Sequence, residues 1–478
     1  MLKLFIDIPL TQHKALAFFA APLVMLAGCQ SYQAKPLDIS STRMELASRS
    51  ASSEQVMDFA KRLAAINTNA IPSDFDPSNG LTLAEAEIVA LVFNPELRVA
   101  RLQVGVLQAT ADTAGLWQDP VTGFNFNDVM NQSGGGTALL GGQIALTIPI
   151  SGRLEAEVER AGAALFAEMA RVQAAEWMTR IQLRRAWSSW TSAIQRIGIV
   201  QQTVQNLQRI IEIVNRMEAV GELPRVEARL FRIEQTTQHV ELERLKMVLK
   251  EEEVALKRIM GFSSLAIMNL VPGQMAAESP TIPNELREHM INQSPVIAAL
   301  KAEYQVSEKV LAREIREQYP DVQLGPSYNT DGNEDFTFGF MFPLPLWNHN
   351  KQGVQEAGAE RELMRARFET TLEIQLAELQ RACVVYESAV MQRRMMEEQL
   401  LPLVDLQATE TQHIAQLGEV NTLLLLQSFT GQQSAKLSLV DARNNETISF
   451  INITQLVGPA PLAQPTLEPV TQTQLSNP

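Results

Sequence analysis

The hydrophobic positions of the chain predict two very long helices, about Arg153–Ala219 and about Gln352–Leu417. In the first, apolar residues recur in steps of three and four, the spacing of a coiled-coil seam: Ile197, Val200, Val204, Leu207, Ile211 and Val214. The next segment repeats this spacing at Val226, Leu230, Ile233, Thr237 and Val240. Gly221 lies between the two and accepts the positive φ of a chain reversal. At about 1.5 Å per residue such a helix reaches roughly 100 Å. We therefore predict a long antiparallel helical hairpin in each half, whereas an ordinary helical bundle, the alternative, rarely uses helices this long.

Two pairs of shorter segments, about 122–150 and about 322–345, alternate apolar with polar or small residues. This period of two predicts β-strands with one apolar face, joined in pairs by hairpin loops. A sheet covered by helices in water would show the same alternation, but a row rich in phenylalanine is typical of a wall that faces lipid. The predicted lipid-facing residues are Ile144, Leu146, Ile148, Phe336, Phe338, Phe340 and Phe342. Arg153 and Lys351 follow these segments and are predicted to anchor the chain at the membrane surface.

Four strands cannot close a membrane barrel, since closed barrels need at least about eight. An open strand edge is not tolerated in hydrocarbon, because its backbone groups have no hydrogen-bond partner there. If all four strands form, the chain must associate with further copies in order to insert.

Several sequence positions of the first half recur at a nearly constant distance in the second half. Pro95 and Pro120 recur 200 residues later as Pro295 and Pro320, and the Gly-Glu pair at Gly221 recurs 197 residues later. We predict an internal duplication with repeats at 81–261 and 262–458. Each repeat holds a first helix (about Leu83–Leu116 and about Asn284–Gln318), two strands and a helical hairpin.

The N-terminus has the pattern of a secretory signal, with an apolar run over 15–27 that is too short to span a bilayer. The signal ends Leu26-Ala27-Gly28-Cys29, which resembles the bacterial lipobox, so we expect 1–28 to be removed and Cys29 to carry lipid. A plain signal with a chance cysteine is the alternative. In bacterial lipoproteins, a glutamine after that cysteine resembles an outer-membrane address. Residues 29–80 hold one predicted helix, about Ser53–Ala65, and the proline-rich tail at 459–478 is predicted to be disordered.

Composition narrows the function further. The formal charge is −14 and the pI about 5.0, so nucleic acid is not an expected partner. Neither a nucleophile–base pair nor a cluster of metal ligands stands out, so no enzyme activity, cofactor or bound metal is predicted. His349 is isolated, and the methionines near Met391 are expected to fill core space.

Three segments resemble the TolC-type outer-membrane efflux protein family: "LTLAEAEIVALVFNPELRVAR", "LTIPISGRLEAEVERAGAAL" and "FPLPLWNHNKQGVQEAGAE". The last is similar to the heavy-metal branch of the family. The resemblance covers about 81–458. It implies mixed α and β structure: a homotrimer with a shared 12-stranded outer-membrane β-barrel, continuous with a periplasmic tunnel of coiled-coil helices, with 29–80 along the tunnel's exterior. It also implies partners, namely a periplasmic adaptor protein and an inner-membrane pump.

The resemblance places adaptor docking at the two Gly-Glu turns: Gly221, Glu222, Leu223, Gly418, Glu419 and Val420. The chain departs from the family at the positions where some members carry acidic residues around the pore entrance. Those possible gate positions are Leu424 and Gln427 here, so no acidic ring is expected there. Glu227 could supply charge from the other hairpin, or it could lie on a solvated helix face.

The resulting prediction is a passive exit duct in the outer membrane, lipid-anchored and extending into the periplasm, that conducts small toxic compounds or metal ions received from an inner-membrane pump. The alternative is the outer-membrane duct of a type I protein secretion system, which would have the same fold. A periplasmic coiled-coil scaffold without a pore would leave the four alternating segments unexplained.

Overall fold

A computed structural model of the protein describes residues 32–66, 75–130, 136–273, 283–330, 334–416 and 422–459. The chain forms two compact units, Met1–Ser48 and Arg49–Pro478. The first contains helix α2 (Ile39–Ser48), which the sequence analysis did not predict. The lipid site expected at Cys29, the turn expected at Gly418, Glu419 and Val420, and the tail from residue 460 all lie outside the described residues.

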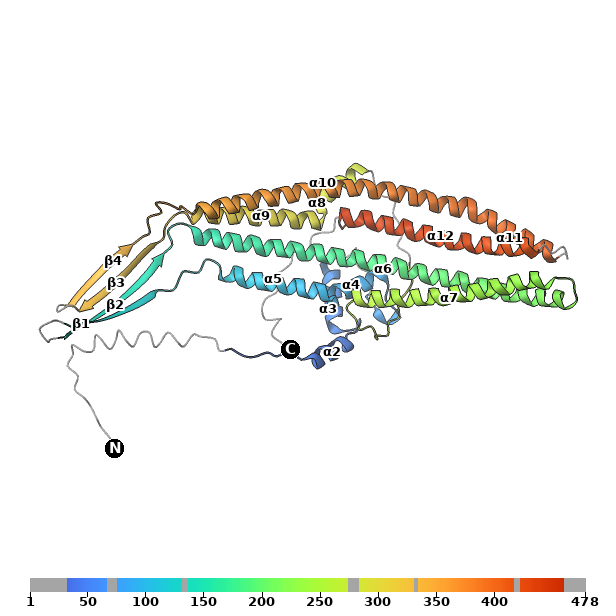
Figure 1. Ribbon diagram of the computed structural model, residues 1–478, viewed down its shortest axis with the longest axis horizontal. Coiled ribbons are helices and arrows are strands. Elements are labelled where there is room, and N and C mark those ends of the chain that lie inside the picture. The colour runs from blue at the N-terminus through green and yellow to red at the C-terminus, as the bar shows by residue number, and fades with distance from the viewer. Residues whose placement is uncertain are drawn as a thin grey trace, which may run out of the picture. The chain divides into compact units, whose positions relative to one another are not determined.

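In the second unit, one order of elements occurs twice: two short helices, two strands, a long helix and a return helix (Figure 1). Helix α3 (Glu54–Ile66) and a 3₁₀ turn, η2 (Pro77–Asn79), come before the first copy. The first copy comprises α4 (Leu83–Phe93), α5 (Pro95–Thr113), β1 (Val121–Met130), β2 (Gly136–Ile148), α6 (Arg153–Ala219) and α7 (Arg225–Ile259). The second comprises α8 (Pro283–Gln293), α9 (Pro295–Arg316), β3 (Val322–Thr330), β4 (Glu334–Met341), α10 (Lys351–Met395), the π-helical segment η3 (Met396–Leu400), α11 (Leu401–Gln416) and α12 (Thr422–Val457).

The predicted first helix of each repeat is in fact two helices. The breaks fall at Asn94–Pro95 and Ser294–Pro295, the positions that recur 200 residues apart. Proline lacks a backbone N–H and drives the residue before it away from helical geometry. At the first break, the Asn94 side chain accepts hydrogen bonds from the amides of Glu96 and Leu97, so it caps the helix that follows.

The coiled coil of α6 with α7 is only partly as predicted. On α6 the predicted seam packs inward, with Val200 and Leu207 buried. On α7 the predicted seam is wrong, because Val226, Ile233 and Val240 are exposed. The buried residues of α7 belong to a second stripe with heptad spacing: Ala228, Phe231, Gln238, Leu242 and Leu245. All but Gln238 cluster with apolar residues of α6.

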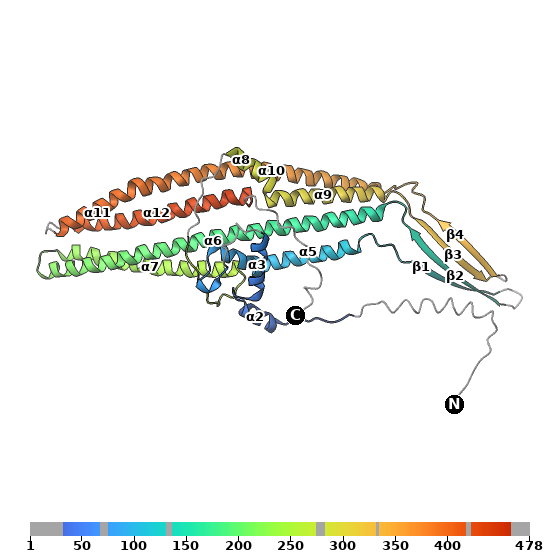
Figure 2. The same cartoon turned by 180° about the vertical axis from the view of Figure 1, so that it is seen from behind.

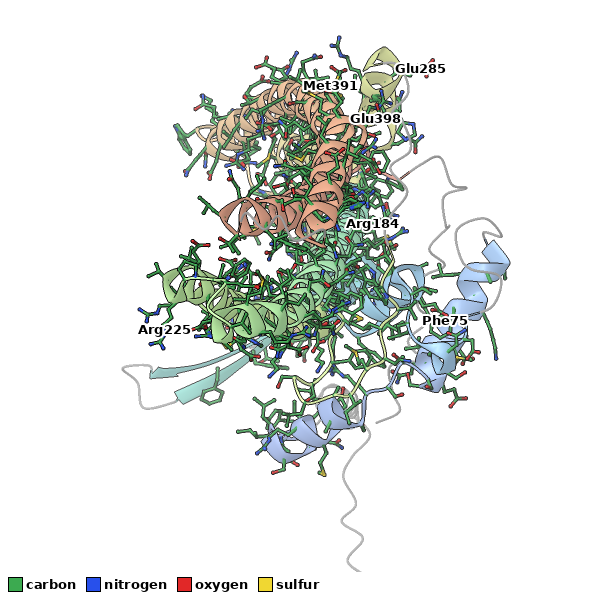
Figure 3. The ribbon with its side chains drawn as sticks, turned by 90° about the vertical axis from the view of Figure 1, so that its right-hand side faces the viewer. Phe75, Arg184, Arg225, Glu285, Met391 and Glu398 are labelled. Carbon is green, nitrogen blue, oxygen red and sulfur yellow. The ribbon has the colours of Figure 1, made fainter. Side chains whose placement is uncertain are left out.

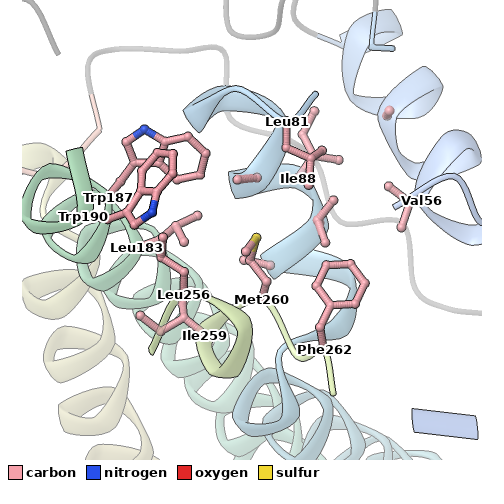
Figure 4. Packing of buried hydrophobic residues seen from close by; sticks show 14 residues of the cluster. Val56, Leu81, Ile88, Leu183, Trp187, Trp190, Leu256, Ile259, Met260 and Phe262 are labelled. Atoms are coloured by element: carbon pink, nitrogen blue, oxygen red, sulfur yellow. The ribbon is translucent and has the colours of Figure 1, made fainter. Parts of the chain in front are cut away.

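The largest hydrophobic core lies midway along α6, where α4 and the end of α7 pack against α6 and α3 packs against α4 (Figure 4). Trp187 and Trp190 meet edge to face there, with ring centroids 5.2 Å apart. The chain leaves α7 through Gly261 with φ of +74°. A Cβ at this glycine would lie 2.0 Å from the carbonyl oxygen of Phe93, so only glycine fits between α7 and α4.

In the part of the chain that the structure describes, no helix is both long enough and apolar enough to cross a membrane.

Candidate functional site

The four strands form one antiparallel sheet in the order β1-β2-β3-β4. Phe124 on β1 pairs with Gly142, Gly142 pairs with Tyr328 on β3, and Tyr328 pairs with Phe336 on β4. The two predicted repeats therefore meet in the sheet, through the pairing of β2 with β3.

The register gives the sheet one apolar face. Residues paired across strands share a face, and successive residues of a strand alternate between faces. Within 121–126, 141–148, 322–330 and 335–341, the residues of the first face other than Thr122 and Thr330 are apolar, aromatic or glycine: Phe124, Phe126, Gly142, Ile144, Leu146, Ile148, Val322, Leu324, Pro326, Tyr328, Phe336, Phe338 and Phe340. The opposite face is mostly small or polar: Val121, Gly123, Asn125, Gly141, Gln143, Ala145, Thr147, Gln323, Gly325, Ser327, Asn329, Asp335, Thr337, Gly339 and Met341.

The phenylalanines of β4 are open to solvent in the single chain. Phe336, Phe338 and Phe340 are 72%, 67% and 71% exposed, and Phe342 lies just beyond the end of the strand. Exposed apolar patches of this kind mark a surface that contacts a partner or a membrane. Within the described residues, β1 and β4 each pair with one neighbour, so both edges of the sheet remain open.

The connection from β2 to α6 is held by an ion pair. Arg153 Nε lies 2.7 Å from Asp321 Oδ2, just before β3, and Ser151 Oγ donates to the same carboxylate at 3.3 Å. Arg153 thus joins the two repeats beneath the sheet, which differs from the predicted membrane anchor. Lys351, at the corresponding start of α10, is exposed.

The turn between α6 and α7 lies at the opposite end of α6 from the sheet (Figures 1 and 2). Gly221 has φ of +82°, as predicted for the reversal, and the Glu222 amide donates to the Met217 carbonyl at 2.9 Å. Gly221 and Glu222 are exposed. Leu223 is buried among the residues that join α6 to α7, so in the single chain it packs the turn rather than presenting a surface.

Charged side chains surround this turn. Glu218 at the end of α6 pairs with Arg232 of α7 at 2.6 Å. Arg225, the first residue of α7, projects outward and its side chain is 88% exposed (Figure 3). The turn therefore presents exposed groups of both signs, Glu222 and Arg225, on a framework fixed by an internal ion pair.

Two polar contacts join α7 of the first hairpin to α12 of the second. Thr422 Oγ1 donates to the carboxylate of Glu227, which is half-buried. Further from the turn, Gln433 Nε2 donates to Oε1 of Gln238, and both side chains are buried. Of the other possible gate positions, Leu424 and Gln427 are exposed. Glu227 therefore links the two hairpins within the single chain, and its part in charging a pore entrance stays a prediction.

A buried charge cluster that sequence reasoning missed joins α4 to α6. Glu87 is buried, and Arg180 Nε donates to Glu87 Oε2 at 2.7 Å. The guanidiniums of Arg180 and Arg184 lie 5.7 and 5.6 Å from the centre of the Trp177 ring. Burial alone would raise the pKa of Glu87, but the two arginines together outweigh it and hold that pKa below its usual value. An acidic residue inside the apolar helix "LAEAEIVALVF" was the available signal.

The described residues do not form a candidate metal site. Within the described ranges, no group of three or more His, Cys, Asp or Glu side chains could hold a metal ion. His349 is exposed. Met391 and Met395 are also exposed in the single chain, so they do not fill core space as predicted (Figure 3).

Comparison with known proteins gives a family match over part of the chain and a fold over most of it. Residues 89–262 match the family described as outer membrane efflux protein. The cobalt-zinc-cadmium resistance protein CzcC of Cupriavidus metallidurans is 24% identical over 218 residues, which are 45% of this chain and 52% of that protein. The match thus spans about half the length of this curated relative.

Solved structures match over more of the chain. CusC superposes with a TM-score of 0.69 at 15% identity, covering 91% of this chain and all of that one. A membrane protein from Pseudomonas aeruginosa gives 0.68 at 15% identity, with 82% and 93% covered. The CmeC outer membrane channel of Campylobacter jejuni gives 0.65 at 14% identity, with 90% and 94% covered. The chain therefore has the fold of the TolC-type channels, and its resemblance to the outer-membrane efflux protein family is confirmed.

Proposed function

We propose that the protein is the outer-membrane exit duct of a tripartite efflux system and works as a homotrimer. The observation that carries this proposal is the exposed apolar face of a sheet whose two edges are open, at one end of helices that reach roughly 100 Å. Lipid would cover the apolar face, and the polar face would line a water-filled passage.

Closure of the sheet requires further copies. In hydrocarbon each unpaired backbone group costs several kcal/mol, so the edge strand β1 of one copy would pair with β4 of the next. Three copies supply the 12 strands that the family resemblance implies. The exposed stripe of α7, which includes Val226, Ile233 and Val240, supports association along the helices as well, because it repeats at coiled-coil spacing and is open to solvent in the part of the chain that the structure describes.

Light scattering in detergent tests the assembly. A mass of three chains is expected. A stable monomer whose strands are protected from hydrogen exchange would contradict the strand-pairing argument.

The turn at Gly221 and Glu222, with its counterpart at Gly418, Glu419 and Val420, is proposed as the periplasmic tip that docks the adaptor. Its distance from the sheet and the exposed charges at Glu222 and Arg225 support this. A photo-crosslinker placed at position 222 should capture the adaptor. The same group at Met247, which is exposed on α7 far from the turn, is the matched control. Capture from position 247 but not from 222 would reject the tip assignment.

Metal ions or small toxic compounds are the proposed cargo, because the match to CzcC concerns a cobalt-zinc-cadmium resistance protein. Expression in a host that lacks its own duct should restore growth in zinc, cobalt or cadmium salts when the cognate pump and adaptor are present. Restored export of a protein substrate without metal resistance would instead favour a type I secretion duct.

A further inference from the structure

Four helices continue the four strands of the sheet in the same order. α5 precedes β1, α6 follows β2, α9 precedes β3 and α10 follows β4. These helices pack side by side as one layer in the order α5-α6-α9-α10 (Figures 1 and 2). The polar face of the sheet, which is proposed to line the passage, therefore continues into one face of this helical layer.

A cavity of 260 Å³ touches all four helices of the layer. Leu107 lines it from α5, the outer helix on one side, and Met364 lines it from α10, the outer helix on the other side. A cavity reaches both outer helices only on the side toward which the layer curves. When copies of the layer close into a ring, the concave side of each copy faces inward. In the proposed trimer this cavity would therefore lie in the wall of the passage.

The floor of the cavity is apolar and is built from small or branched side chains. Ala164 and Ala167 of α6 lie beside Val306 and Val310 of α9, and Ala357 of α10 closes the far side. Ala167 and Ala357 are buried. Because alanine leaves space that a longer side chain would fill, the floor offers a ligand a hydrocarbon surface, as ligand pockets commonly do.

Two guanidinium groups near the cavity have their own partners. Arg171 lines the cavity and lies 2.6 Å from Oε1 of Glu303 and 2.9 Å from Oε2 of Glu168. Arg367 Nη1 lies 3.8 Å from the sulfur of Met364. Arg171 is therefore offset by two carboxylates, and it does not make the cavity a site for anions.

Glu360 gives the cavity an excess of negative charge. It lines the cavity from α10 and is exposed, so its carboxylate lies at the open side. Among the residues that the structure describes, it has no ion-pair partner. Together with the groups named above, this makes three carboxylates to two guanidiniums. An apolar floor with a free carboxylate at its edge is complementary to a ligand that has one hydrocarbon part and one positive charge.

We propose that this cavity is a contact site for amphipathic organic cations that pass along the duct. The hydrocarbon part of the ligand would rest on the alanine and valine floor, and its cationic group would lie beside Glu360. This inference rests on the proposed function and deepens it, because it names one class among the small toxic compounds. The binding should be weak, since a site in a passage must also release what it binds.

Binding of benzyltrimethylammonium to the full-length protein in detergent, measured by saturation-transfer NMR, tests the site. The native protein should bind this probe. Glu360→Gln should weaken binding roughly fivefold, the scale of one exposed charge pair. Ala164→Leu should weaken it by filling the floor. Glu362→Gln is the matched control, because position 362 lies two residues further along α10, on its opposite side, and should leave binding unchanged.

Two further probes test the chemical class. Tetramethylammonium carries the charge without the ring, and benzenesulfonate carries a ring with the opposite charge, so both should bind more weakly than benzyltrimethylammonium. Equal binding of any two of the three probes, or equal effects of the variants at positions 360 and 362, would refute the site.

Light scattering on the same samples separates this inference from the proposed function. A trimer that does not bind benzyltrimethylammonium would overturn the contact site and leave the duct standing. A monomer would overturn the duct, and with it the place of the cavity in the wall of a passage, whether or not the probe binds.

Discussion

Replacing Thr422 by valine tests the link between the two hairpins near the tip. The substitution keeps the branched shape of the side chain but removes the hydroxyl that donates to Glu227. A hydrogen bond to a charged group contributes about 1.5–3 kcal/mol. Glu227 is only half-buried, so water would partly replace the lost donor and the lower end of this range applies. About 1.5 kcal/mol corresponds to roughly a tenfold change in an equilibrium constant.

If separation of the hairpins opens the tip, Thr422→Val should raise the ratio of open to closed states roughly tenfold. This ratio is measured as the open probability in single-channel recordings in planar bilayers. Thr422→Ser is the matched control, since it keeps the hydroxyl and should leave the ratio near that of the native protein. Glu227→Ala should have a similar effect to Thr422→Val, and the double variant should add little because both remove the same bond. Equal open probabilities of the valine and serine variants would refute the link as a gate.

Three further changes give clear expectations. Phe338→Arg should cost about 2–4 kcal/mol near the bilayer midplane and reduce the trimer recovered from membranes, whereas Thr337→Arg on the polar face should be tolerated; equal losses would contradict the face assignment. Glu87→Gln should lower the thermal midpoint at neutral pH. Because the pKa of Glu87 is lowered in the fold, its contribution to stability is complete above the ordinary carboxylate pKa and is lost as pH falls through the lower folded value, so the difference between native and variant midpoints should shrink in acid. Cys29→Ala should abolish incorporation of labelled palmitate, and unchanged labelling would reject the lipid site.

Much of the fold is predictable from hydrophobic spacing, because long helices and alternating strands each impose a period on the sequence. The bounds of α6 agree with the prediction at both ends. The assignment of faces is harder. On α7 two stripes have coiled-coil spacing, one led by Val226 and one by Ala228, and spacing alone does not tell which stripe meets α6 within the chain.

The candidate site was predictable to a similar extent. Alternation grouped Ile144 and Phe338 correctly within their own strands, but only the pairing of β2 with β3 places them on one face. The contacts of Glu227 with Thr422 and of Glu87 with Arg180 join segments far apart in the sequence. No local pattern specifies such partners, since they depend on how the two hairpins pack.

The pairing of β2 with β3 has a consequence for the order in which the protein is made. β2 ends at Ile148, and its partner begins only at Val322, after the whole first hairpin and α8 and α9 have been synthesised. Contacts this distant in sequence form late, because the entropy cost of closing a long loop is incurred before the contacts can stabilise the fold. The first strand pair must therefore wait with an open apolar edge while the helices form, and such edges promote aggregation. A chain interrupted between α7 and β3 would leave this edge without its partner strand, so the β1–β2 pair is a segment that a chaperone would need to protect until β3 is available.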